Sequence, residues 1–433
     1  MTAFFFLTVI ALLPRSLLSI PRVIVDPSPP HSQFVSTVHV DSAPVLLVGT
    51  NVVMKGAPWI PSTRGFDVCE TTMETGNTTS CQSFTLGDVK HLKDLNYNFI
   101  RLGVIWAGGQ PDGPSNSLGD EFNERLHDFL TLCDDNDINV LFDLHEDAVG
   151  TAVCGEGLPM WFSKLAIPNR IGLPIYPLFE EKDDCGITDL DSWAEYAGDD
   201  DYNIKNPCCR KMNQANWAAL DFTVQAQETL RFLFNDGAEH YVRYVKLLAE
   251  AAMEHPSVIG IELMNEPPAI QRGKMWEFWE LCYDAVREIS EELAVGIMDT
   301  GEEALRTDIG LSDKTKAWLA QAKNLFYAFH DYGKDPAAVT SKALEIVAKR
   351  QMPALLTEFG GYGDGCEHQK NATAANIGSS YWHYSDYCWP KHCDDDADGN
   401  PVPDGHCEFD PSVERWGACI TGWGSGDHNF VCS

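Results

Sequence analysis

The chain has 433 residues, enough for one large barrel or two ordinary domains, and 44% of them are hydrophobic, as in a packed globular protein. Its formal net charge of -33 argues against a nucleic-acid partner, because phosphate binding requires clustered Lys and Arg. The acidic excess favours solubility, or an acidic or salty environment.

The chain begins with a short apolar run from Met1 to Leu13 that ends at Pro14. This run is too short to span a bilayer and is typical of a signal-peptide core, so we predict a signal peptide over residues 1–20. A membrane anchor is the alternative. Residues 21–40 are rich in Pro and Ser and are expected to lead from the signal into the folded domain.

Fourteen cysteines agree with an oxidising compartment, where disulfides persist. Zinc binding is the competing interpretation, and the lack of a Cys-x-x-Cys pair disfavours it. We expect Cys69 and Cys81 to pair, and we expect glycosylation at Asn77 and Asn371. The protein is therefore predicted to be secreted, or to reside in the lumen of the secretory or lysosomal pathway.

Apolar runs that end in polar residues alternate with helical patterns along residues 41–390. The runs predict eight strands, at residues 45–53, 98–104, 138–145, 257–267, 294–298, 324–330, 353–360 and 381–384. The helical patterns fall at residues 84–96, 120–135, 216–254, 274–293 and 336–350. This alternation predicts an α/β protein, a closed parallel (β/α)8 TIM barrel. Long βα loops are expected, the longest following the third strand.

Residues 391–433 differ from the barrel region, because they are rich in Cys, Asp and Gly and poor in aliphatic residues. We predict a short disulfide-rich C-terminal tail. Asp394, Asp396 and Asp398 match the start of a calcium loop, but Gly405 stands where the twelfth-position Glu is expected. A solvated acidic turn is the alternative, and no other metal site and no cofactor are predicted.

Two strand ends carry a glutamate. Glu266 follows an apolar run in Asn265-Glu266-Pro267, and Glu358 follows another in Thr357-Glu358-Phe359-Gly360. Catalytic groups of (β/α)8 barrels lie at the C-terminal ends of the strands. Two such carboxylates suit a retaining glycosidase, in which one protonates the leaving oxygen and the other attacks the anomeric carbon. Solvated residues at strand–loop junctions are the alternative.

Two further residues are unusual for a buried strand. Arg101 lies inside the second predicted strand, and a buried cation requires a partner, which a carboxylate at the barrel centre would supply. An ordinary structural ion pair is the alternative. His145 ends the third predicted strand, where a hydrogen-bonded core role competes with a catalytic one.

These features together resemble glycoside hydrolase family 5, and more specifically its endoglycoceramidase group. The segments that carry the resemblance are Gly49–Trp59, Asn98–Trp106, Asp143–Asp147, Cys154–Trp161 and His330–Tyr332, with the two glutamate motifs. Glu146 replaces the Gln that this group has in Asp-x-His-Gln-Asp. The resemblance covers about residues 45 to 390.

The resemblance implies a role for each matching residue. Glu266 would be the acid/base, Glu358 the nucleophile, and Asn265 the ligand of the sugar 2-hydroxyl. Arg101 would orient the nucleophile. Tyr332 would hydrogen-bond near Glu358, and the residues lining the subsite before the scissile bond would be Lys55, Asp143, His145, His330 and Trp382. Asn265 and Glu266 would share one face only if the backbone kinks between them.

The implied reaction is hydrolysis of the bond between oligosaccharide and ceramide in glycosphingolipids, without a cofactor. The implied partner is a glycolipid or oligosaccharide, with peripheral contact to membrane lipid. The chain departs from the group after residue 390, where a C-terminal β-sandwich is expected, and this puts ceramide specificity in question. A β-glucanase, mannanase or β-glucosidase is the alternative enzyme. An inactive glycan- or lipid-binding barrel is the alternative of another class.

Overall fold

The computed structural model describes residues 21–26, 33–38, 43–56, 58–63, 84–150, 152, 155–169, 217–268, 271–299, 311–360, 366–384, 392–393 and 407–408. The predicted signal peptide, the Cys69–Cys81 pair, Asn77 and the three calcium candidates lie outside these residues. Cys366 takes part in a disulfide, whereas Cys133 and Cys282 are buried free thiols.

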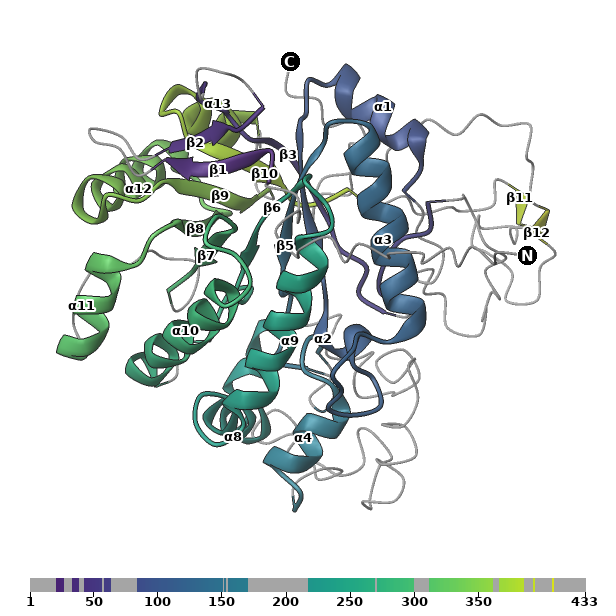
Figure 1. Cartoon of the computed structure of the whole chain (residues 1–433), viewed down its shortest axis with the longest axis vertical. Coiled ribbons are helices and arrows are strands. Elements are labelled where there is room, and N and C mark those ends of the chain that lie inside the picture. The colour runs from purple at the N-terminus through teal and green to yellow at the C-terminus, as the bar shows by residue number, and fades with distance from the viewer. Residues whose placement is uncertain are drawn as a thin grey trace, which may run out of the picture.

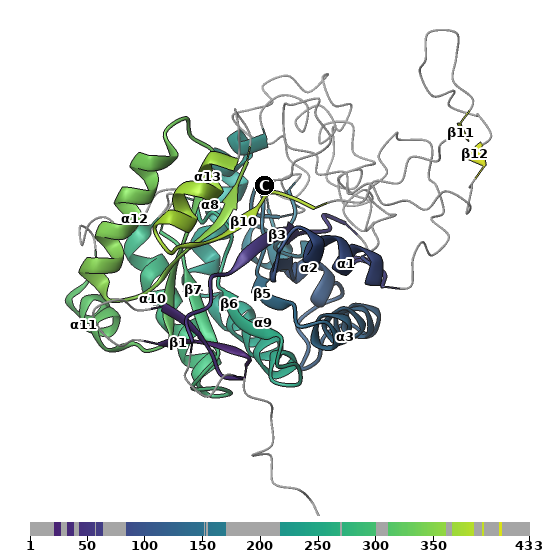
Figure 2. The same cartoon turned by 90° about the horizontal axis from the view of Figure 1, so that it is seen from above.

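Eight parallel strands close into a barrel in the order β10-β3-β4-β5-β6-β7-β8-β9, with helices packed around them (Figures 1 and 2). The strands are β3 Val48–Val52, β4 Phe99–Gly103, β5 Asn139–Asp143, β6 Val258–Glu262, β7 Ala294–Ile297, β8 Leu325–Asp331, β9 Ala354–Phe359 and β10 Gly378–Tyr381. The predicted (β/α)8 TIM barrel is confirmed. Almost every strand residue is buried, because helices cover the outside and side chains fill the inside.

The described helices are α1 Leu86–Asp94, α2 Trp106–Gly109, α3 Asp120–Asp135, α4 Met160–Ala166, the 3-10 helix η6 Trp217–Phe222, α8 Val224–Leu233, α9 Ala238–Ala252, α10 Arg272–Arg287, α11 Asp313–Gln321, α12 Pro336–Arg350 and α13 Cys366–Ala374. Side-chain caps explain several of their starts. Thr85 and Asp88 form a capping box at α1, and Asp335 caps α12, which has Pro336 in its first turn. None of these helices is long and apolar enough to cross a membrane.

Two strand boundaries differ from the predicted ones. The fourth barrel strand ends at Glu262, so Asn265 and Glu266 lie on the loop after it. The eighth strand is Gly378–Tyr381 and ends where the predicted strand begins. Its Gly-Ser-Ser sequence has no apolar signature, yet Ser379 and Ser380 are fully buried. Hydropathy therefore placed this strand too late in the chain.

A β-hairpin that the sequence did not reveal covers the N-terminal end of the barrel. Strands β1 Val23–Asp26 and β2 Gln33–Ser36 pair antiparallel within the region assigned as a leader. The backbone N–H of Arg22 donates to the carbonyl of Pro256, just before β6, at 2.8 Å. Phe34 packs edge-on against Phe326 of β8, with ring centroids 5.6 Å apart. The hairpin thus forms the floor of the barrel core.

We predict that Phe34→Ala lowers the free energy of unfolding by about 3–5 kcal/mol, because it removes a buried aromatic side chain and leaves a cavity under the barrel. Urea unfolding followed by tryptophan fluorescence measures the change. Val38→Ala, on the same segment but with the side chain 67% exposed, is the control and should change stability little. Equal effects of the two substitutions would mean that the hairpin does not support the barrel.

Candidate active site

The charged residues of the barrel interior meet at the C-terminal ends of the strands. Arg101 lies on β4, Asp143 and Glu262 are the last residues of β5 and β6, and Glu358 lies near the end of β9. Asp143 stands opposite Glu262 in the register, and His330 of β8 stands opposite Glu358. The closed sheet therefore brings these side chains into one layer, as in the catalytic face of a (β/α)8 barrel.

Arg101 is fully buried at the centre of this layer and uses all of its N–H donors. Nε and Nη2 donate to the two oxygens of Glu262 at 2.9 and 3.0 Å. Nη2 also donates to Asn265 Oδ1, while Nη1 donates to Asn51 Oδ1, both at 2.9 Å. The remaining Nη1 donor reaches Glu358 Oε1 at 2.6 Å. The five N–H groups of a guanidinium are thereby directed at five acceptors.

A second cation lies beside Asp143. Asp143 Oδ2 is 2.7 Å from Nδ1 of this cation, His145. Asp143 Oδ1 is 2.8 Å from Arg101 Nη2, where the two groups form an ion pair without a directed hydrogen bond. The other ring nitrogen of His145 is 3.3 Å from Asp147 Oδ2. Burial lowers the pKa of His145, but Asp143 and Asp147 outweigh burial and raise it to about 10. His145 is therefore a cation at neutral pH.

The Glu358 carboxylate is held in its charged form. Besides the bond from Arg101, its Oε2 accepts from the Tyr332 hydroxyl at 2.7 Å and lies 3.4 Å from His330 Nδ1. Burial alone would raise the pKa of Glu358, but His330 and Arg101 outweigh burial and hold it below its usual value. Glu358 is thus a buried, ionised and oriented carboxylate.

Glu266 occupies a strained position on the loop after β6. Its backbone φ is 35°, in the left-handed region that costs a non-glycine residue on the order of 1–3 kcal/mol. Its Oε1 lies 2.5 Å from His330 Nδ1, and its side chain is 21% exposed. One oxygen of Glu266 and one of Glu358 lie within 4.8 Å of each other. Such close spacing is typical of retaining glycosidases, whose two carboxyl groups are about 5–5.5 Å apart.

Asn265 connects Arg101 with the loop that follows β5. Its Oδ1 accepts from Arg101, and its Nδ2 donates to the carbonyl of Glu146 at 3.0 Å. The left-handed backbone at Glu266 supplies the kink that lets Asn265 and Glu266 share one side of the barrel mouth. Both residues lie beyond the strand, so the alternation of side chains along a strand does not apply to them.

Lys55, Asp147, Glu156 and Trp382 form a polar wall with an aromatic face. The Lys55 ammonium bonds to Asp147 and lies 2.9 Å from Glu156 Oε1. It also lies 5.1 Å from the ring centroid of Trp382, whose ring stacks on His145 at 5.2 Å and 10°. A sugar ring has apolar C–H faces and hydroxyl edges, so an indole beside alternating donors and acceptors is suited to bind it.

The glycine-rich segment after the third barrel strand builds this wall. Asp147 and Glu156 pair through an antiparallel bridge. A Cβ on Gly155 would lie 2.0 Å from the Asp147 carbonyl oxygen, and one on Gly157 would lie 2.4 Å from Glu146 Cβ. Gly157 also has a φ of 138°, which L side chains rarely adopt. Only glycine at these positions lets the segment approach closely enough for Glu156 to reach Lys55.

The structure brings the ten predicted site residues into one connected cluster: Lys55, Arg101, Asp143, His145, Asn265, Glu266, His330, Tyr332, Glu358 and Trp382. The cluster also contains four residues that were not predicted as members: Asn51, Asp147, Glu156 and Glu262. Glu262 could have been predicted from the sequence, because it is a carboxylate inside an apolar strand, just as Arg101 is a cation inside one.

Three groups of carboxylates and histidines in the described part of the chain have ligand atoms close enough to hold a metal ion. Two groups contain His145 and one contains His330, and both imidazoles have a raised pKa. A metal requires a neutral imidazole, and four of the five carboxylates in these groups already pair with Arg101 or Lys55. The donor set therefore suits sugar hydroxyls better than a metal ion.

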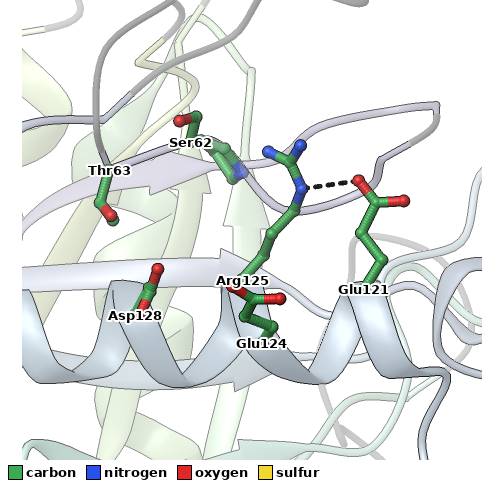
Figure 3. Close-up of a pocket in the computed structure, with 7 residues that line it drawn as sticks. Ser62, Thr63, Glu121, Glu124, Arg125 and Asp128 are labelled. Carbon is green, nitrogen blue, oxygen red and sulfur yellow. Dashed lines mark hydrogen bonds and ion pairs between the residues drawn. The ribbon is translucent and has the colours of Figure 1, made fainter. Parts of the chain in front are cut away.

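A cavity of about 120 Å³ lies elsewhere, between α3 and the segment at residues 61–63 (Figure 3). Arg125 donates to Glu121 beside it at 3.0 Å. None of the ten predicted site residues lines this cavity, so it does not belong to their cluster.

We predict that Arg101→Met lowers the free energy of unfolding by about 3–5 kcal/mol at neutral pH, because buried carboxylates lose their shared cation. Without the cation, the pKa of Glu358 in the folded variant rises above that of the unfolded chain, and the pKa of Glu262, which burial already raises in the parent, rises further. A raised folded-state pKa stabilises the fold at low pH and loses that contribution as pH rises. The deficit should therefore be smaller at pH 5 than at pH 8 in urea unfolding.

Lys246→Met, which breaks an ion pair with Glu288 on the surface, is the matched control and should change stability little at either pH. A deficit in Arg101→Met that grows toward pH 5 would contradict the assignment of Arg101 as the shared cation of ionised carboxylates.

Comparisons with known proteins agree on the family. Residues 62–391 match the family model described as cellulase (glycosyl hydrolase family 5). An endoglycoceramidase of Hydra vulgaris is 29% identical over 226 residues, which are 51% of this chain and 36% of the relative. One of Cyanea nozakii is 28% identical over 225 residues, 51% of this chain and 37% of the relative. The matched part of the chain thus spans little more than a third of these relatives.

Solved structures show the same fold. The iminocyclitol complex of endo-glycoceramidase II from Rhodococcus sp. superposes with a TM-score of 0.55 at 18% identity, covering 84% of this chain and 78% of that chain. The ganglioside GM3 complex of that enzyme gives 0.52 at 17% identity, covering 79% and 74%. Because the family model covers most of the barrel, the chain belongs to glycoside hydrolase family 5.

Proposed function

We propose that this family 5 glycosidase hydrolyses β-glycosides with retention, with Glu358 as the nucleophile and Glu266 as the acid/base. The observation that carries the proposal is the pairing of an ionised, Arg101-bound carboxylate with a second carboxyl within 4.8 Å. The Glu358 carboxylate attacks the anomeric carbon, while Glu266 gives its proton to the departing oxygen. Water, deprotonated by Glu266, then attacks the same carbon and releases Glu358.

The environments of the two carboxyls suit these different roles. Glu358 is nearly buried and receives donors from Arg101 and Tyr332, which favours the charged form. Glu266 is more exposed, and its Oε1 already contacts His330, so we assign the transferred proton to Oε2. His330 Nδ1 contacts both Glu266 and Glu358 and so fixes the position of one carboxyl relative to the other.

The remaining predicted residues form the sugar subsite in this proposal. Asn265, oriented by Arg101, holds the 2-hydroxyl beside the anomeric carbon. Trp382 supports the ring face, while Lys55, His145 and Asp143 provide or orient hydroxyl partners along its edge. Binding of the sugar hydroxyls would strengthen as charge develops in the transition state.

The proposed substrate is a glycosphingolipid, cleaved between oligosaccharide and ceramide. Support comes from the two endoglycoceramidase relatives and from the Rhodococcus enzyme, one structure of which is a complex with ganglioside GM3. Exposed apolar side chains also lie on the insert after β5, with Leu165 51% and Phe222 71% exposed. Phe222 follows Asp221, whose pKa is raised to about 7 by burial and by the carboxylates of Asp147 and Glu266. Phe222 is therefore next in sequence to a residue whose pKa responds to the proposed acid/base.

A soluble β-glucan or mannan is the alternative substrate, because the family model is that of the cellulases and the catalytic pair does not select the leaving group. A catalytically inactive binding barrel is disfavoured by the intact carboxyl pair and its donors. We further propose that the protein acts outside the cell or in the lumen of the secretory pathway, where a glycolipid headgroup is accessible.

The test is incubation with lactosylceramide in mixed micelles, and separately with a soluble β-glucan. We expect release of intact lactose and free ceramide, detected by mass spectrometry. Glu266→Gln should slow turnover by about 10²–10⁴-fold, because it removes the general acid. Glu358→Gln should abolish it. Cleavage of the glucan alone would contradict the ceramide assignment, and no turnover of any β-glycoside by the folded parent would contradict the enzyme.

The role of Phe222 is tested in the same assay. Phe222→Ser should slow hydrolysis of lactosylceramide and leave hydrolysis of a soluble aryl β-lactoside unchanged. Leu344→Ser on α12, with a side chain 42% exposed, is the matched control and should affect neither substrate. An equal loss on both substrates would mean that Phe222 does not contact the lipid.

A further inference from the structure

We propose that Glu262 is a positioning residue of the reaction, which fixes the Arg101 guanidinium so that one N–H is directed at Glu358 and another at Asn265. The inference rests on the proposed function, because it assigns a further role within the same site. Glu262 itself does not touch the reacting atoms in this assignment, and acts through Arg101.

The contact between Glu262 and Arg101 is bidentate. Both carboxylate oxygens accept, one from Nε at 2.9 Å and one from Nη2 at 3.0 Å. Two parallel bonds to one edge of a planar guanidinium fix both its plane and its rotation. A single acceptor, such as Asn51 on Nη1, leaves the group free to pivot.

The fixed orientation determines where the other donors point. With one edge of the guanidinium held by Glu262, the remaining Nη1 and Nη2 hydrogens reach Glu358 at 2.6 Å and Asn265 at 2.9 Å. A pivot of the guanidinium would move both donors together. Glu262 therefore aligns two other residues through Arg101: Glu358, the proposed nucleophile, and Asn265, the proposed ligand of the sugar 2-hydroxyl.

Glu262 is fully buried, and its surroundings come from four strands. The charged and titratable groups that face it are Arg101 of β4, Asp143 of β5 and His330 of β8. The Thr357 hydroxyl of β9 lies 3.5 Å from its Oε1. A buried ion pair rarely adds net stability compared with apolar packing, which favours a role in geometry over one in folding.

Glu262→Gln separates the possible roles. An amide offers one acceptor and presents its NH2 to a guanidinium N–H, so one of the two bonds is lost and the guanidinium can pivot. The distance from the Arg101 donor to Glu358 then lengthens, and the apparent pKa of Glu358 rises. Removal of the Glu262 charge without a pivot would instead lower the apparent pKa of Glu358. The two effects have opposite signs.

Two readouts measure the sign. The first is a ¹³C NMR titration of Glu labelled at the carboxyl carbon, with the Glu358 signal assigned by its loss in Glu358→Gln. The second is the pH profile of kcat/KM on an activated aryl β-lactoside. We expect both to shift to higher pH in Glu262→Gln, with kcat lower by about 10²-fold and KM little changed. Glu262→Asp, which keeps two acceptors, should recover part of the loss.

Thr357→Val removes a neutral hydroxyl beside Glu262 Oε1 but leaves the Glu262 carboxylate with both acceptors for Arg101, so it is the control and should keep the parent pH profile. An unshifted or lowered Glu358 titration in Glu262→Gln, with only a lower unfolding temperature, would overturn the positioning role. If the parent hydrolyses no β-glycoside, the proposed function fails, and the NMR titration still decides whether Glu262 controls the contact between Arg101 and Glu358.

Discussion

The site depends on one cation enclosed in the barrel. Arg101 lies on β4 with no exposed surface, and three carboxylates from three other strands, those of Asp143, Glu262 and Glu358, lie within 3.0 Å of it. Such a charge is costly to bury, so the fold forms around it only if every donor finds an acceptor. The closed sheet provides most of these acceptors, because β3, β5, β6 and β9 each direct one side chain at Arg101.

The buried position of Arg101 also gives the two proposed catalytic residues, Glu358 and Glu266, different environments. The cation side of the layer keeps Glu358 ionised and aims it, while Glu266 lies on a strained loop beyond β6, away from Arg101 and nearer to solvent. Two identical side chains thereby acquire different environments, as acid/base and nucleophile require. The glycine-rich insert adds Glu156 and Asp147, which hold Lys55 at the edge of the sugar subsite.

Much of this arrangement was predictable from sequence, because apolar runs that end in polar residues mark barrel strands and place their ends at one face. The misses have physical causes. Strand β10 has the sequence Gly-Ser-Ser-Tyr, which is buried but not apolar, so hydropathy did not reveal it. The hairpin strands β1 and β2 have only four residues each, too few for a clear period. The backbone kink at Glu266 has no composition signal, since glutamate rarely adopts a positive φ.

The most direct test of the account is to trap the covalent intermediate. A 2-deoxy-2-fluoro-β-lactosyl fluoride slows both steps but hydrolysis of the intermediate most, so the sugar accumulates on the nucleophile. Peptic digestion and tandem mass spectrometry then locate the label. We predict one sugar per chain, esterified to Glu358. Arg101→Met should not reach the labelling rate of the parent protein. A label on Glu266, or none while the parent turns over β-lactosides, would contradict the assignment of Glu358 as the nucleophile held by Arg101.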